Sequence, residues 1–74
     1  TKILYLYLQF NQIELIEKNS FSKLGNLLRL DLSHNKLNKL DDSVFDGLFN
    51  LLYFNLSFNN IQKIGFNLLN SLSS

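Results

Sequence analysis

Cysteine, methionine, proline, alanine and tryptophan are all missing from this chain of 74 residues and 8.6 kDa. Without cysteine, neither a disulfide framework nor a thiolate metal site can stabilise a small core. The lack of methionine predicts either a processed chain or a fragment of a longer protein. A chain of this length forms one small domain at most and buries only about 60% of its unfolded surface, so its stability is expected to be marginal unless something extends the core.

An excess of one charge and long apolar runs are missing as well. The formal net charge is +1 with 18% charged residues, which gives no electrostatic basis for binding nucleic acid or an anionic membrane. The longest apolar run is the segment Ile3–Leu8, far short of the roughly 18 residues that span a bilayer. The N-terminal segment has neither the layout of a signal peptide nor a lipidation signal, so we expect no membrane insertion by this segment.

Leucine and asparagine are abundant, and their placement repeats. The chain divides into three units of 24 residues, which are 3–26, 27–50 and 51–74. Seven positions of the unit are apolar in all three copies; in the second unit they are Leu27, Leu30, Leu32, Leu37, Leu40, Phe45 and Leu48. The ninth position is asparagine every time, as Asn11, Asn35 and Asn59. The repeat therefore specifies one structural element three times over.

The spacing within the unit disfavours three amphipathic helices. Leu6 and Leu8, like Leu30 and Leu32, are period-two pairs typical of strands, and an asparagine after each pair suits a turn. The pattern L-x-x-L-x-L-x-x-N-x-L-x-x-L-x-x-x-x-F-x-x-L of the second unit resembles the leucine-rich repeat family, and the resemblance covers residues 3–74. It implies an α/β solenoid, a right-handed coil with a short parallel β-sheet on its concave face and irregular or short helical convex segments.

Under this resemblance, strands are expected over 4–8, 28–32 and 52–56, and short helical turns over 19–24, 43–48 and 67–72. The asparagine of each unit is expected to bond the backbone of its own and the neighbouring coil, which makes it structural. Phe21 and Phe45 are expected to stack from coil to coil. The fragment shows no end caps, so further repeats or caps are expected on both sides.

The candidate ligand-binding residues are the outward strand positions and the rim position after each strand. They are Tyr5, Tyr7, Phe10, Arg29, Asp31, His34, Tyr53, Asn55 and Phe58. Tyrosine, phenylalanine and arginine are enriched at binding hot spots, which favours a patch that binds a protein or peptide. The competing interpretation is that Arg29 stacks between Tyr5 and Tyr53 and pairs with Asp31, so that the patch satisfies itself.

Catalysis and metal binding find little support in the sequence. Asp31, Ser33 and His34 supply the residue types of a nucleophilic triad, but adjacent side chains diverge on an extended segment and no glycine-rich turn offers an oxyanion hole. Metal ligation needs a cluster of His, Cys or carboxylates, and Asp41–Asp42 alone is more simply a solvated turn. We therefore expect no enzymatic activity, no metal and no cofactor.

The leading functional hypothesis is a recognition module within a longer receptor or secreted binding protein. The 24-residue unit resembles the subclass common in animal extracellular receptors, such as Toll-like receptors, and this resemblance carries the expectation of an extracellular, signalling role. One N-glycosylation sequon is present at Asn55, but chance alone predicts about one such triplet, so it does not indicate secretion. The alternatives are spacer repeats whose ligand binds elsewhere in the solenoid, and an intracellular adaptor in the cytoplasm.

Overall fold

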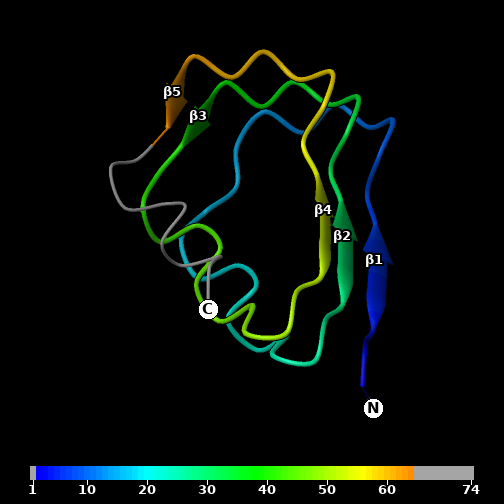
Figure 1. Ribbon diagram of the computed structural model, residues 1–74. Coiled ribbons are helices and arrows are strands. Elements are labelled where there is room, and N and C mark those ends of the chain that lie inside the picture. The colour runs from blue at the N-terminus through cyan, green and yellow to red at the C-terminus, as the bar shows by residue number, and fades with distance from the viewer. Residues whose placement is uncertain (1, 65–74) are drawn as a thin grey trace.

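The computed structural model describes residues 2–64, which form two small parallel sheets. The larger sheet has the strand order β1-β2-β4, and its strands are β1 (Tyr5–Tyr7), β2 (Arg29–Asp31) and β4 (Tyr53–Asn55). The smaller sheet pairs β3 (Lys39–Leu40) with β5 (Lys63–Ile64). The chain runs from one sheet to the other and back, so that corresponding segments of successive units lie side by side (Figure 1).

The register of both sheets follows the sequence repeat. Tyr5 lies opposite Arg29 and Arg29 lies opposite Tyr53, so each step across the larger sheet advances the chain by one unit. Lys39 and Lys63 are related in the same way in the smaller sheet. The predicted parallel pairing is confirmed, although each strand is one residue shorter at both ends than the ranges 4–8, 28–32 and 52–56. The smaller sheet was not predicted.

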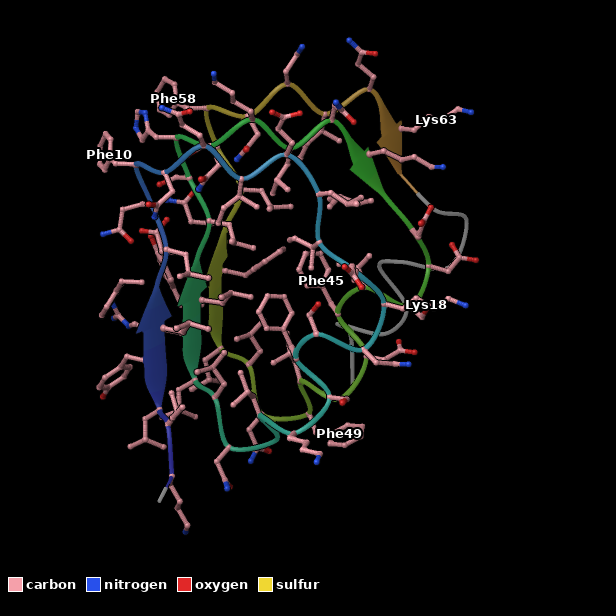
Figure 2. All side chains as sticks on the ribbon, turned by 180° about the vertical axis from the view of Figure 1, so that it is seen from behind. Phe10, Lys18, Phe45, Phe49, Phe58 and Lys63 are labelled. Carbon is pink, nitrogen blue, oxygen red and sulfur yellow. The ribbon has the colours of Figure 1, made fainter. Side chains whose placement is uncertain are left out.

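The core lies between the two sheets and is built mainly from the second unit. Six of its apolar repeat positions are at most 1% exposed, and these are Leu27, Leu30, Leu32, Leu37, Leu40 and Phe45. Side chains of the first and third units, such as Leu6 and Phe54, are half-buried and pack against this cluster. Phe45 points into the space between the sheets (Figure 2). The rings of Phe21 and Phe45 stack with centroids 6.0 Å apart, which confirms the predicted aromatic spine.

The segments opposite the larger sheet are chains of turns, and residues 2–64 contain no helix. The expectation of short helices at 19–24 and 43–48 was therefore wrong, and the third predicted segment, 67–72, lies outside the described residues. Hydrogen bonds there span three residues, as from Ser22 N to Asn19 O. Asn19 has a φ of 62° and Gly47 a φ of 96°, and a left-handed residue interrupts a right-handed helix.

Gly47 also marks a close approach between the first and second units. A Cβ atom at this position would lie 2.8 Å from both the Cα and the carbonyl oxygen of Ser22. Because backbone cannot move aside as a flexible side chain can, this contact and the positive φ both require glycine. The turn segments of the first and second units thus pack backbone against backbone at this point.

Candidate ligand-binding face

The outer face of the β1-β2-β4 sheet carries six of the nine candidate residues. Alternation along each strand turns Leu6, Leu30 and Phe54 toward the core. It turns the remaining strand residues outward, and these are Tyr5, Tyr7, Arg29, Asp31, Tyr53 and Asn55. We call these six side chains the sheet face. Its three tyrosines are 54%, 54% and 43% exposed, so a wide aromatic surface is open to a partner.

Contacts within the sheet face satisfy Arg29 only in part. The Arg29 guanidinium lies 4.9 Å from the centroid of the Tyr53 ring, within the range of a cation–π contact. Tyr5 instead stacks on Tyr7, with ring centroids 6.4 Å apart. The competing interpretation paired Arg29 with Asp31, but the structure forms no ion pair between these two side chains. The guanidinium therefore keeps its charge without a carboxylate partner in the described part of the chain.

Asp31 makes its hydrogen bonds to the chain that leaves its own strand. One carboxylate oxygen accepts the backbone N–H of Ser33 at 2.9 Å. The Ser33 hydroxyl, this N–H and the nearby His34 together hold the pKa of the Asp31 carboxyl below its usual value, against a smaller opposing effect of burial. Asn55 occupies the same position one unit later, and its amide oxygen accepts the N–H of Ser57 at 2.9 Å and the hydroxyl at 2.6 Å. A fixed turn thus follows each of these two strands.

Three rings stack in a row where the strands end, and we call Phe10, His34 and Phe58 the aromatic row. The His34 ring lies between the other two, at centroid distances of 4.2 Å and 4.3 Å and interplanar angles of 11° and 9°. Phe10 and Phe58 are each 73% exposed, and they project from the same corner of the molecule (Figure 2). The structure therefore gathers the three rim residues into one continuous apolar ridge.

The backbone of the aromatic row is held in an uncommon conformation. All three residues have positive φ, at 58°, 55° and 59°. A bulky side chain in this region is a genuine outlier that persists only where the surroundings determine it, at a cost on the order of 1–3 kcal/mol. Here the N–H of Phe10 donates to the Ser33 carbonyl at 3.1 Å, and the N–H of His34 donates to the Ser57 carbonyl at 3.0 Å. Phe58 takes the same φ without a described acceptor for its N–H, and in all three units the asparagine that follows bonds the carbonyl groups two and three residues before it. Sequence reasoning missed this strain, although the repeated asparagine is the local signal that accompanies it.

The repeated asparagines support this turn from inside. The Asn35 side chain donates to the carbonyl oxygens of Leu8, Leu32 and Ser33 at 3.0–3.1 Å and accepts the N–H of Ile13 at 3.1 Å. Asn59 makes the equivalent contacts one unit later. Asn11 bonds only the carbonyl oxygens of Leu8 and Gln9, within its own unit. The structural role expected for the asparagines agrees with these contacts, and the bonds between units occur only where a preceding unit exists.

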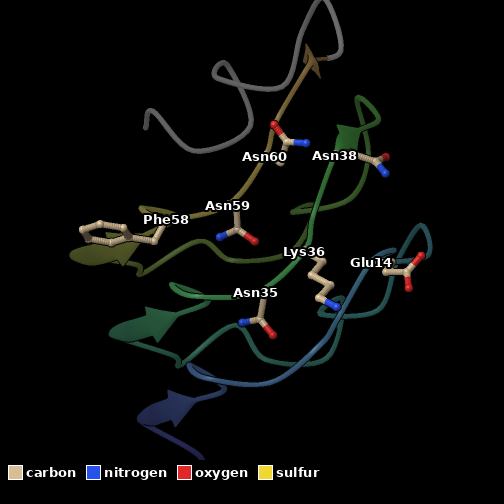
Figure 3. A pocket seen from close by; sticks show the side chains of 7 residues that line it. All are labelled: Glu14, Asn35, Lys36, Asn38, Phe58, Asn59 and Asn60. Carbon is tan, nitrogen blue, oxygen red and sulfur yellow. The ribbon is translucent and has the colours of Figure 1, made fainter.

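A polar hollow of about 510 Å³ lies beside the aromatic row, on the side where the chain leaves the larger sheet. Figure 3 shows its lining, which is Glu14, Asn35, Lys36, Asn38, Phe58, Asn59 and Asn60. The amides of Asn35 and Asn59 are already occupied by backbone groups, so they offer the hollow little further hydrogen bonding. Sequence reasoning did not single out this hollow, because most of its lining apart from Asn35, Phe58 and Asn59 comes from positions that the repeat leaves free.

Neither catalytic nor metal-binding geometry is assembled in the described residues. Ser33 is only 5% exposed, and the His34 ring is stacked between two phenylalanines, so no exposed nucleophile is paired with a base. Within residues 2–64, no three His, Cys, Asp or Glu residues come together as a metal site. That part of the chain also holds no helix that is long and apolar enough to cross a membrane.

Comparison with known proteins gives one result. A family model described as Leucine rich repeat matches residues 1–61 and, in a second placement, residues 29–74, so the two matches together cover the whole chain. No curated protein and no solved structure shows a significant match.

Proposed function

Because the chain belongs to the leucine-rich repeat family, whose repeats generally mediate protein–protein interaction, we propose that the sheet face and the aromatic row together bind a protein or peptide. The family is a non-enzymatic interaction module, which fits a surface without a paired nucleophile and base. We further propose that the three units are coils of a right-handed solenoid and an interior piece of a longer receptor or secreted protein. The larger sheet would then lie on the concave face of that solenoid.

The exposure of the aromatic row is the observation that carries the proposal. Two phenylalanines that are 73% exposed lie beside three exposed tyrosines, on a sheet whose other face forms the core. Large contiguous aromatic surface is costly to leave in water, and it is what binding hot spots are made of. The fixed backbone of the row and its internal stacking also order these side chains before a partner arrives, which lowers the entropic cost of binding.

A structural role as spacer coils is the second candidate function, and one observation favours it. Arg29 already stacks on Tyr53, so part of the sheet face is satisfied within the chain. Under this alternative the ligand would bind elsewhere in a longer solenoid, and substitutions on the sheet face would leave binding unchanged. An intracellular adaptor differs mainly in compartment, and it would use the same surface.

For the compartment we propose an extracellular location or the ectodomain of a membrane protein, on the resemblance of the unit to the repeats of extracellular receptors. Asn55 would then be open to N-glycosylation. Its amide oxygen is held by Ser57, the third residue of the sequon, and its side chain lies on the sheet face. A glycan there would cover the β4 end of the surface and leave the β1 end, with Tyr5 and Tyr7, as the accessible part.

A peptide selection tests the binding proposal directly. Peptides selected from a displayed random library against the wild-type chain are expected to lose affinity for the Tyr7→Ala/Tyr53→Ala variant by about tenfold or more, since aromatic anchors dominate binding energy. Phe49→Ala is the matched control, because Phe49 is 77% exposed but lies at the far end of the molecule from the aromatic row. Dissociation constants that are equal for wild type and the double variant would contradict the proposal and favour the spacer role.

A further inference from the structure

Arg29 is the only positively charged residue of the sheet face, and it lies on the middle strand of the larger sheet. β2 pairs with β1 on one side and with β4 on the other, so Tyr5 and Tyr53 are the direct neighbours of Arg29 across the sheet. The Arg29 side chain is exposed, as both tyrosines are. A partner that lies on the two tyrosines therefore also covers the guanidinium between them.

The chain itself leaves the hydrogen-bonding groups of Arg29 open. The guanidinium carbon lies 4.9 Å from the centroid of the Tyr53 ring, whose π-system attracts the positive charge. None of the hydrogen bonds or ion pairs formed within residues 2–64 involves the five N–H groups of this guanidinium. These donors are therefore available to a partner.

Asp31 lies two residues further along the same strand face, but its carboxylate bonds the chain that follows its own strand. It accepts the N–H of Ser33 at 2.9 Å, and the Ser33 hydroxyl also bonds it. On the neighbouring strands the same position holds Tyr7 and Asn55, which carry no charge. Arg29 is thus the one charged group of the sheet face that has neither an ion-pair partner nor a hydrogen bond in the described part of the chain.

The exposed charge of Arg29 restricts the chemistry of the partner. A guanidinium that loses its water without gaining an acceptor is strongly disfavoured. A carboxylate replaces the lost hydrogen bonds, because its two oxygens match the planar fork of arginine and bring the opposite charge. A phosphate also fits the fork, but it carries nearly two negative charges at neutral pH, and the excess would face Asp31 on the same strand. A single carboxylate therefore matches the charge of this face best.

We propose, on the basis of the function proposed above, that the protein or peptide bound by the sheet face presents an aspartate or glutamate side chain to Arg29. Apolar side chains on either side of that carboxylate would lie against Tyr5 and Tyr53. Arg29 is then a specificity-determining residue, since arginines near the centre of an interface are among its hot spots. Asp31, about 7 Å further along the strand, weakens the binding of the same carboxylate by repulsion.

A displayed peptide library with a restricted centre is the probe for this carboxylate. Its central position allows only aspartate, glutamate, asparagine and glutamine, and the flanking positions are random. Peptides selected against the wild-type chain are expected to carry aspartate or glutamate at the centre. Replacing that residue by its amide in a synthetic copy is expected to lower affinity for the wild type by about tenfold, and affinity for Arg29→Gln by less than about twofold, because the ion pair is absent there.

Asp31→Asn gives a prediction in the opposite direction. The turn after β2 keeps its hydrogen bond in this variant, since Asn55 accepts the equivalent N–H one unit later. Removal of a negative charge about 7 Å from Arg29 is expected to raise affinity for the acidic peptide by about threefold and to leave affinity for the amide peptide unchanged. A damaged fold would weaken the binding of both peptides, so a selective gain identifies the charge of the sheet face as the cause.

Equal affinities of the acidic and amide peptides for the wild type contradict the proposal, and so does tighter binding of a copy with phosphotyrosine at the centre. If Arg29→Gln loses its circular dichroism spectrum, the two peptides measured on wild type and Asp31→Asn give the same decision. The Tyr7→Ala/Tyr53→Ala variant separates the two proposals. Peptides that need these tyrosines but ignore the central charge overturn the carboxylate proposal alone, whereas peptides that bind independently of the tyrosines, or a selection without binders, overturn both.

Discussion

The second unit and the first unit carry the same residue types at the same positions, yet the structure treats them differently. Leu30 is fully buried, whereas Leu6 at the same position is half-buried. Asn35 is 8% exposed and makes bonds to two units, whereas Asn11 is exposed and makes bonds to its own unit alone. The difference lies in the neighbours, because the second unit is covered on both sides.

This comparison shows where the stability of a repeat protein is located. A unit has one apolar face toward the core and one toward each neighbour, and only stacking buries the latter two. The contribution of a repeat position to the free energy of unfolding therefore depends more on how many units cover it than on its residue type. Substituting the same residue in two units measures this contribution directly.

Truncation of the buried leucine is expected to give the largest effect. Leu30→Ala removes a fully buried side chain between two neighbours and leaves a cavity, which should lower the free energy of unfolding by about 3–4 kcal/mol. Leu6→Ala removes a side chain that is already half in water, and the expected loss is about 1–2 kcal/mol. Urea unfolding of both variants at low protein concentration gives the two values.

A smaller truncation serves as a control for this result. Leu30→Val is a smaller truncation, which still yields a measurable transition if Leu30→Ala abolishes folding of a chain this short. Equal losses at Leu30 and Leu6 would contradict this account, because coverage by neighbouring units would then not decide the loss.

The asparagine pair is expected to give an intermediate effect. Asn35→Ala leaves the N–H of Ile13 without its partner at a half-buried position, while the Leu8 carbonyl still accepts the side chain of Asn11. One unsatisfied group costs about 1–3 kcal/mol, so a loss in this range is expected. Asn11→Ala removes only exposed bonds within one unit, and we expect a loss below about 1 kcal/mol. The measurement is again urea unfolding, and a larger loss at Asn11 than at Asn35 would contradict this account.

The parts of the fold that depend on local alternation could be predicted from the sequence. Leu6-x-Leu8 and its repeats fixed the strand centres and the inward and outward faces, because a strand has a period of two. The spacing between units then fixed the register, since identical positions pair across the sheet. The stacking of Phe21 on Phe45 followed from the same argument. The nine candidate ligand-binding residues were placed by these rules, and six of them do share one sheet face.

What depends on contacts between units escaped prediction. Short helical turns were expected at 19–24 and 43–48, but Gly47 meets the backbone of Ser22 and Asn19 takes a positive φ, so non-helical turns form instead. The positive φ of His34 recurs at Phe10 and Phe58, each followed by the repeated asparagine, but the sequence analysis assigned that asparagine to the bonds between coils and not to this turn. The competing interpretation, in which Arg29 pairs with Asp31, fails because the N–H of Ser33, two residues further on, bonds that carboxylate.

Asp31 gives the smallest expected effect and compares the second unit with the third. Asn55 shows that an amide fits this position and accepts the same turn N–H, so Asp31→Asn should leave stability at neutral pH nearly unchanged. Because the pKa of Asp31 is lowered in the folded chain, its carboxylate contributes stability that is present above the unfolded pKa of about 3.9 and is lost as the pH falls through the folded pKa. The wild type should therefore lose slightly more stability than the variant between about pH 5 and about pH 2. All other acids are common to the two proteins, so the difference between their free energies of unfolding isolates the Asp31 carboxylate. A difference that does not change with pH would show that the turn after β2 gains no stability from the charge.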